Sequence, residues 1–188
     1  RTTNRHDLSL KPPRKTMLDL LKDAGRDVIA VGKIFDIFDG EGVTEKIKTT
    51  GNTNGIAFTK ALQTRDFEGL AFVNLVDFDM LYGHRRDVAG YAAAATEFDK
   101  FVADFIPGMR EGDILMVTAD HGCDPSYTKT TDHTREYVPY LICGKGVKPG
   151  VDLGTRLCFG TIAHTICDYL GVDASTLDGQ SVLSDILK

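Results

Sequence analysis

The sequence predicts an α/β fold in which a mainly parallel β-sheet has helices on both faces. Two observations support this prediction. Apolar segments of strand length alternate along the chain with segments of helical periodicity. The apolar segments are also continuously apolar, which is typical of strands covered on both faces, as in parallel sheets with helical crossovers.

The first half of the chain contains two predicted helices and two predicted strands. In order, these are a helix at 15–24, a strand at 27–31, a helix at 54–63 and a strand at 70–76. Gly25 is a suitable terminator for the first helix, because glycine adopts left-handed backbone conformations without strain. Thr53 or Asn52 is expected to cap the second helix.

The second half continues the alternation. In order, we expect a helix at 90–105, strands at 114–118 and 138–143, a helix at 161–170 and a short helix at 182–187. The segment 90–105 contains a run of alanines, which favour helix strongly. Pro139 lacks a backbone N–H group, so we expect it at the start or at the edge of its strand.

Length and charge restrict the class of protein. The chain has 188 residues, a net charge of -5 and 26% charged residues, which indicates a soluble globular domain without tandem repeats. An acidic surface argues against binding to nucleic acid, and the apolar runs are too short for a membrane span. We therefore expect a cytoplasmic protein that meets any anionic substrate with local cations. The chain starts at Arg1 without an initiator methionine, so we also expect it to be part of a longer protein.

Polar residues that can bind metals and phosphates follow three of the predicted strands. Lys33 follows the first strand, Asp79 and His84 follow the second, and Asp120 and His121 follow the third. In open α/β sheets, ligands bind beyond the carboxyl ends of the strands. The sequence therefore predicts that these side chains share one rim of the sheet.

The histidines and aspartates at this rim predict a metal site. A capping aspartate beside a solvated histidine would explain one Asp-His pair, but two pairs at two strand ends, with His133 downstream, favour metal binding. Asp120 and His121 are adjacent, so in extended backbone they would point to opposite sides and suit two neighbouring ions. Mixed nitrogen and oxygen ligands suit Mn²⁺ or Zn²⁺, and carboxylates favour Mn²⁺. Two ions roughly 4 Å apart are suited to phosphoryl transfer.

Three segments carry a resemblance to a known family. They are VDFDMLYGHRRD at 76–87, TADHGCDP at 118–125 and TDHTREYVP at 131–139. With them, the whole chain resembles the later part of the phosphopentomutase family, within the alkaline phosphatase superfamily. The resemblance implies part of an alkaline-phosphatase-like core and an isomerase that interconverts ribose 1-phosphate and ribose 5-phosphate, and their deoxyribose counterparts. It also implies a phosphoenzyme and two Mn²⁺ ions.

The resemblance assigns roles to individual residues. Five residues match metal ligands, and these are Asp79, His84 and His133 for one ion and Asp120 and His121 for the other. Lys33 matches a substrate-contacting lysine. The loop before His133 is about one residue longer than in many relatives, so Asp132 is an alternative oxygen ligand.

Other features of the family have no counterpart in the chain. Neither its N-terminal aspartate ligand nor its phospho-accepting threonine is matched, so no catalytic nucleophile is identified. Residues 1–12 match the tail of a cap domain with its linker, and residues 13–188 match the C-terminal part of the core. The implied partners are a pentose phosphate substrate, a sugar bisphosphate activator and the N-terminal remainder of the enzyme. We expect the isolated chain to be inactive.

Two alternatives to this function stay open. The chain could belong to another metal-dependent phosphomutase or phosphatase of the superfamily, or it could be a non-catalytic metal-binding fragment.

Several arginines have more than one interpretation. Arg85 and Arg86 fit surface ion pairs or support of the metal ligands better than a phosphate clamp. The roles of Arg1, Arg5 and Arg135 are not determined by the sequence.

Four further residues near the predicted elements also have two interpretations. Asp77 and Asp124 are expected to accept hydrogen bonds from ligand imidazoles, or else to be solvated. His164 shares a helix with apolar residues, so packing is favoured over metal binding. Cys123 is interpreted as a small filler rather than a reactive thiol.

Overall fold

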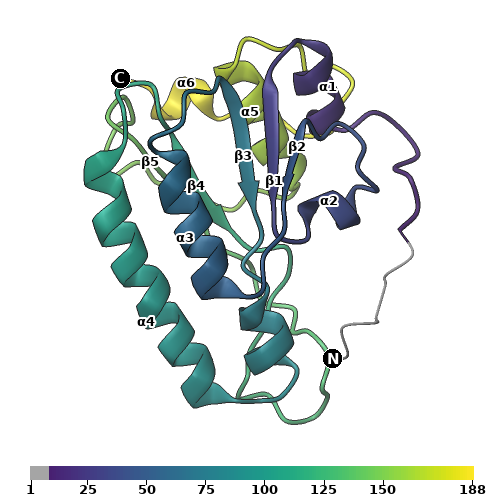
Figure 1. Ribbon diagram of the computed structural model, residues 1–188, viewed down its shortest axis with the longest axis vertical. Helices are drawn as coiled ribbons and strands as arrows, with labels where there is room; N and C mark the ends of the chain where they lie inside the picture. The colour runs from purple at the N-terminus through teal and green to yellow at the C-terminus, as the bar shows by residue number, and fades with distance from the viewer. Residues whose placement is uncertain (1–8) are drawn as a thin grey trace. The chain divides into compact units, whose positions relative to one another are not determined.

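The computed structural model describes residues 9–188 (Figure 1). These residues form two compact units. The first unit contains the described residues up to Thr49, together with Asp66–Asn74 and Asp152–Asp185. The second contains Thr50–Arg65, Leu75–Val151 and Ile186–Lys188. The predicted boundary between residues 1–12 and 13–188 involves residues outside the described range, and it stays a prediction.

A three-stranded parallel sheet lies in the first unit. Its central strand is β1, Asp27–Val31, with β2, Glu45–Ile47, on one side and β3, Gly69–Val73, on the other. All five residues of β1 pair with the five of β3, and the four from Val28 to Val31 are buried. The prediction of an α/β fold with a parallel sheet is thereby confirmed.

The helices of the first unit are short. They are α1, Met17–Asp23, α2, Ile34–Ile37, and α5, Gly160–Tyr169, while α6, Leu183–Ile186, spans the point where the chain enters the second unit. The Asp19 carboxylate accepts hydrogen bonds from the backbone N–H and the hydroxyl of Thr16, which fixes the start of α1. Gly25 has φ +75° directly after the helix, as its predicted role as terminator requires.

The core of the first unit forms between α1, β1 and α5. Leu18 and Leu21 from α1 pack with Val28 and Ala30 from β1 and with Cys167 from α5, and all five are fully buried. Burial raises the pKa of the Cys167 thiol to about 11, so it behaves as a small apolar side chain.

The second unit contains helices and an antiparallel pair of strands. In chain order they are α3, Asn52–Leu62, the π-helix η1, Phe78–Gly83, α4, Val88–Phe105, the 3₁₀-helix η2, Ile106–Gly108, and the strands β4, Leu115–Thr118, and β5, Tyr140–Cys143. β4 and β5 pair antiparallel and form a separate two-stranded sheet, whereas the sequence predicted one mainly parallel sheet. Pro139 lies immediately before β5, at the predicted strand start.

Helices α3 and α4 run side by side in the same direction (Figure 1). Thr53 Oγ1 donates to Glu97 Oε1 at 2.8 Å. About two helical turns further along both helices, Lys60 Nζ contacts Asp104 Oδ2 at 2.9 Å. Gln63 Nε2 closes the row by donating to the Phe105 carbonyl at 2.7 Å. Among the described residues, none of the helices has both the length and the apolar character needed to cross a membrane.

The structure differs from the predicted elements mainly in short segments. Elements α2, β2, η1 and η2 were not predicted, and β3 ends at Val73 rather than at residue 76. β2 has the sequence Glu-Lys-Ile, which lacks the apolar pattern of a buried strand because it lies at the edge of its sheet.

Replacement of Leu21 with alanine is expected to lower the free energy of unfolding by about 2–5 kcal/mol, because it leaves a cavity in the core of the first unit. The matched control is Leu157→Ala, because Leu157 is 91% exposed. Its effect should stay within about 0.5 kcal/mol. Denaturant unfolding of both variants measures the difference, and equal effects would contradict this description of the core.

Candidate metal centre

The π-helix η1 carries the first predicted ligand, Asp79. The Asp79 carbonyl accepts the His84 N–H at 3.0 Å, so η1 fixes the backbone between these two side chains. Gly83 ends the helix at a crowded point, because a Cβ atom there would lie 2.3 Å from Cys123 Sγ. Gly83 is therefore the end of a π-helix, and the missing Cβ admits the next loop.

The start of η1 is tied to the start of α3. Asn52 N donates to Asp77 Oδ2 at 2.6 Å, and Asp77 N donates to Asn52 Oδ1 at 2.9 Å. Asn52 is only 4% exposed. A Cβ at Gly51 would lie 2.7 Å from Asp77 Oδ2, so this glycine permits the contact.

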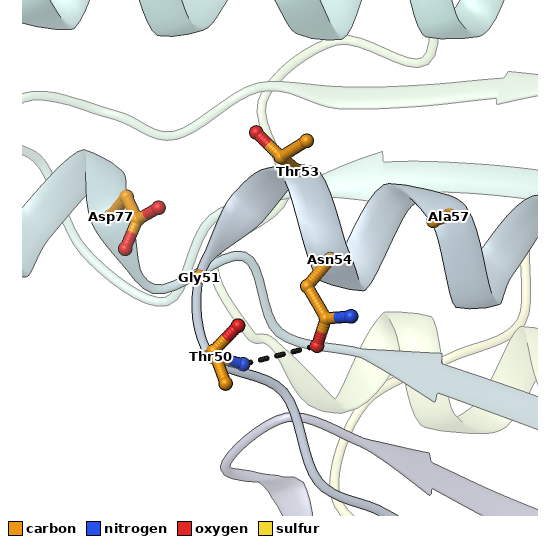
Figure 2. A pocket seen from close by; sticks show the side chains of 6 residues that line it. All are labelled: Thr50, Gly51, Thr53, Asn54, Ala57 and Asp77. Atoms are coloured by element: carbon orange, nitrogen blue, oxygen red, sulfur yellow. Dashed lines mark hydrogen bonds between the residues drawn. The ribbon is translucent and has the colours of Figure 1, made fainter.

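This contact differs from two expectations based on the sequence. One was that Thr53 or Asn52 would cap α3, and the other was that Asp77 would accept a hydrogen bond from a ligand imidazole or be solvated. Helix α3 begins at Asn52, so neither Thr53 nor Asn52 is its N-cap, and the Asp77 carboxylate caps it from a distant segment. Figure 2 shows Asp77 beside Gly51 at the edge of an open pocket, which is also lined by Thr50, Thr53, Asn54 and Ala57.

Imidazoles from three segments surround the Asp79 carboxylate. His84 Nε2 lies 3.3 Å and His133 Nε2 lies 3.4 Å from Asp79 Oδ1. The rings of His121 and His133 are stacked, with centroids 3.6 Å apart and planes 16° apart. Asp79, His121 and His133 each offer one ligand atom, and these atoms all lie within 4.8 Å of one another. The structure therefore brings four of the five predicted ligands together within the second unit.

Backbone carbonyls fix the orientation of two of these rings. His84 Nδ1 lies 2.6 Å from the Thr131 carbonyl oxygen, and His121 Nδ1 lies 3.0 Å from the Gly122 carbonyl oxygen. A carbonyl oxygen only accepts, so each Nδ1 carries a proton and each Nε2 of a neutral ring presents a lone pair. Metal-binding histidines are oriented in this way by the group that accepts their other N–H.

The Asp79 carboxylate is the strongest sign that the site fits a cation. Its Oδ1 atom is buried and makes no hydrogen bond within the described part of the chain. A buried carboxylate oxygen without a partner is costly, and the lone pair on the neighbouring His84 Nε2 makes it more so. A divalent cation would satisfy the oxygen and the nitrogens together, so this donor set fits a metal ion.

Asp120 is placed differently from the other predicted ligands. Its side chain is 75% exposed, and its Oδ1 lies 3.6 Å from His121 Nε2. The two residues lie in a bend after β4, so the alternation of side chains that extended backbone would impose does not apply to them. The assignment of Asp120 and His121 to one ion and of the other ligands to a second stays a prediction.

Asp132 lies on the other side of the His133 ring. Its Oδ1 accepts the His133 backbone N–H at 2.8 Å and lies 3.6 Å from His133 Nδ1, whereas Nε2 faces Asp79. The backbone hydrogen bond from His133 lowers the pKa of the Asp132 carboxyl, so it is ionised at neutral pH. These contacts favour a supporting role over the alternative ligand role.

The segment between His121 and His133 is closed by its own hydrogen bonds. Thr134 N donates to the Gly122 carbonyl at 3.1 Å, and Asp124 N donates to Thr134 Oγ1 at 2.7 Å. The Asp124 carboxylate accepts from the hydroxyl and N–H of Ser126, which lowers its pKa. Asp124 therefore stabilises a local turn, whereas the sequence suggested either an imidazole partner or a solvated carboxylate.

Cys123 acts as the filler that the sequence suggested. Burial raises the pKa of its thiol, so it is protonated at neutral pH, and its Sγ occupies the space beside Gly83.

Four other residues singled out from the sequence lie away from this cluster along the chain. Lys33 is the second residue after β1 in the first unit, at the start of α2, and its contact with substrate stays a prediction. His164 on α5 lies with Nε2 3.0 Å from the Leu177 carbonyl oxygen, in agreement with a packing role. Arg1 and Arg5 lie outside the described residues.

Replacement of Asn52 with alanine should lower the free energy of unfolding by about 1–3 kcal/mol, because it removes a buried side chain and leaves the part-buried Asp77 N–H without its partner. The control is Asn54→Ala, which removes only an exposed hydrogen bond from Thr50 N, drawn in Figure 2. Its cost should be smaller. Denaturant unfolding compares the two, and an Asn52 variant as stable as the control would contradict the role given to this pair.

Comparison with known proteins matches the chain to one family of sequences and to several longer relatives. A family model described as the metalloenzyme superfamily matches residues 1–174. Over 188 residues the chain is 54% identical to a phosphopentomutase of Lachnoclostridium phytofermentans, and it covers 48% of that protein. It is 52% identical to the phosphopentomutases of Acetivibrio thermocellus and Symbiobacterium thermophilum, of which it covers 48% and 47%. The chain thus spans about half the length of these relatives.

A solved structure supports the fold. The phosphoglycerate mutase of Leishmania mexicana superimposes with a TM-score of 0.68 over 88% of this chain and 38% of that one, at 18% sequence identity. At this identity the similarity shows the fold alone, and it confirms the predicted alkaline-phosphatase-like core.

Proposed function

Because the chain belongs to the metalloenzyme superfamily, we propose that it forms the metal-binding part of a phosphopentomutase. This enzyme interconverts ribose 1-phosphate and ribose 5-phosphate, and their deoxyribose counterparts. The proposal is supported by the identity of 49–54% to curated phosphopentomutases along the whole chain. The observation that carries it is the buried Asp79 Oδ1, which has imidazole nitrogens around it and no hydrogen bond.

The proposal includes Mn²⁺ as the metal, with two ions in the complete enzyme. Bound divalent cations would supply charge neutralisation at the phosphoryl oxygens and lower the pKa of an attacking hydroxyl. Asp79, His84, His121 and His133 would hold one side of this centre, and Asp120, more exposed, would face the part of the site completed by other segments.

Residues of this chain would also orient the reacting groups. The carbonyls of Thr131 and Gly122 accept the Nδ1 protons of His84 and His121. The lone pairs on the Nε2 atoms of both rings therefore remain available to bind a cation. Lys33 would supply a positive charge for a substrate phosphate. The phospho-accepting threonine is proposed to come from the N-terminal remainder of the enzyme.

The remaining parts of the proposal concern partners and location. They are a sugar bisphosphate activator, a cytoplasmic location and a dependence on the N-terminal remainder for turnover. The isolated 188-residue chain is accordingly expected to bind about one Mn²⁺ equivalent tightly and to show no mutase activity.

Metal binding can be tested without any enzymatic assay. At Mn²⁺ concentrations about 100-fold above Kd, the free energy of unfolding should rise by about 2.7 kcal/mol, and a chelator should reverse the rise. Asp79→Asn should abolish most of this effect, because the amide keeps the shape of the side chain but loses its charge. The control is Asp152→Asn, which changes an exposed carboxylate of the first unit. Equal Mn²⁺ stabilisation of the Asp79 variant would remove Asp79 from the metal centre.

Activity is tested in the intact protein with ribose 1-phosphate as substrate. The wild type should form ribose 5-phosphate, whereas release of inorganic phosphate would indicate a phosphatase of the superfamily instead. His84→Ala should abolish conversion while the unfolding temperature of the metal-free protein stays unchanged. His164→Gln is the histidine control and should retain activity. His164 lies on α5, where its Nε2 atom is 3.0 Å from the Leu177 carbonyl oxygen, and it is not one of the proposed metal ligands. A near-normal rate for His84→Ala would contradict its assignment.

A further inference from the structure

Arg86 makes an unusual set of contacts next to the candidate metal centre. Its Nη1 donates to the carbonyls of Gly83 and Asp124 at 3.2 and 3.1 Å, and its Nε donates to the Thr130 carbonyl at 2.9 Å. Its Nη2 donates to the Thr130 carbonyl as well and to the Asp132 carbonyl at 2.6 Å. All of these acceptors are backbone oxygens of the second unit.

This hydrogen-bond count excludes one interpretation of the arginine. A guanidinium has five N–H donors, and the five hydrogen bonds of Arg86 use all of them. The side chain therefore has no donor left for a substrate phosphate. It cannot be the phosphate clamp that a pair of arginines next to a metal site suggests.

The acceptors lie on both sides of residues that orient the metal ligands. Thr130 and Asp132 flank Thr131, whose carbonyl oxygen lies 2.6 Å from His84 Nδ1. Asp132 directly precedes His133. The Arg86 side chain thus connects the end of η1 to the segment that ends in His133. Asp79 lies in the first turn of the same helix.

The backbone at Arg86 supports a dedicated role for this side chain. Its φ is +55°, in the left-handed region that residues with a Cβ atom seldom adopt. The Arg86 N–H donates to the Gly83 carbonyl at 3.1 Å, and the Asp87 N–H donates to the Tyr82 carbonyl at 3.0 Å, so the turn is held in this form. Strained conformations of this kind persist where the surrounding contacts compensate for them.

We propose that Arg86 is a positioning residue for the metal centre: its guanidinium fixes the segment 124–133 against the end of η1, so that His84 and His133 are preorganised around Asp79. This inference rests on the proposed metal-binding function. A lysine could not replace the arginine, because an ammonium group lacks the planar fork that reaches four carbonyls in different directions.

The test compares Arg86→Lys with Arg85→Lys in the intact protein. Arg85 is the exposed neighbour of Arg86. Each variant replaces one arginine with a lysine, so the total charge is the same in both. Two quantities are measured: the Kd for Mn²⁺ by calorimetric titration, and amide hydrogen exchange of residues 124–133 in the metal-free protein. Arg86→Lys should raise Kd about 10- to 100-fold and speed exchange in this segment, while Arg85→Lys should change Kd less than about twofold.

A second variant guards against a general loss of folding. Arg86→Gly fits the positive φ and keeps the turn, but it removes the guanidinium. It should raise Kd as Arg86→Lys does, at an unfolding temperature of the metal-free protein close to that of the wild type.

The outcomes separate this inference from the proposed function. If the wild type binds Mn²⁺ and both Arg86 variants bind it equally well, the positioning role is overturned and the metal site stands. If the wild type binds no Mn²⁺, the proposed function fails, and unchanged exchange of residues 124–133 in the variants would overturn the positioning role independently.

Discussion

The arrangement of the second unit depends on one buried carboxylate oxygen, Asp79 Oδ1. It lies 3.3 and 3.4 Å from two imidazole nitrogens and makes no hydrogen bond within the described residues. A folded protein tolerates such an atom only where a further partner compensates for its desolvation. Helix η1 carries this oxygen, and Gly83 ends the helix. Together with the loops that contain the histidines, they keep the oxygen surrounded by imidazole nitrogens.

The supporting contacts come almost entirely from the backbone. Carbonyl oxygens set the tautomers of His84 and His121, and carbonyl oxygens also receive the guanidinium of Arg86. The connection between β4 and β5 contains no helix or regular strand, and its shape is held by its own hydrogen bonds and by those from Arg86. A charged fork that binds several carbonyls at once can order such a segment without a hydrophobic core, and it leaves the imidazole edges free for a ligand.

The sequence predicted the strands and the chemistry better than the contacts that hold them. Buried β1 and the alanine-rich α4 have strong local patterns, and the Asp-His pairs after two strands predicted that Asp79 and His121 would lie close together. The pairing of Asn52 with Asp77 links residues 25 positions apart, and no local pattern encodes it. The contacts of Arg86 are still harder to predict, because any residue type can supply a backbone carbonyl.

The interleaving of the two units has a consequence for how the protein can be dissected. The chain passes between the units at residues 49–50, 65–66, 74–75, 151–152 and 185–186. The second unit, which contains His84, His121 and His133, is therefore not a contiguous stretch of the chain, and no truncation from either end isolates it. A protease that cut at 65–66, 74–75 or 151–152 would produce two pieces that each hold portions of both units. A single cut at any of these three crossings would therefore nick the protein rather than release a metal-binding module.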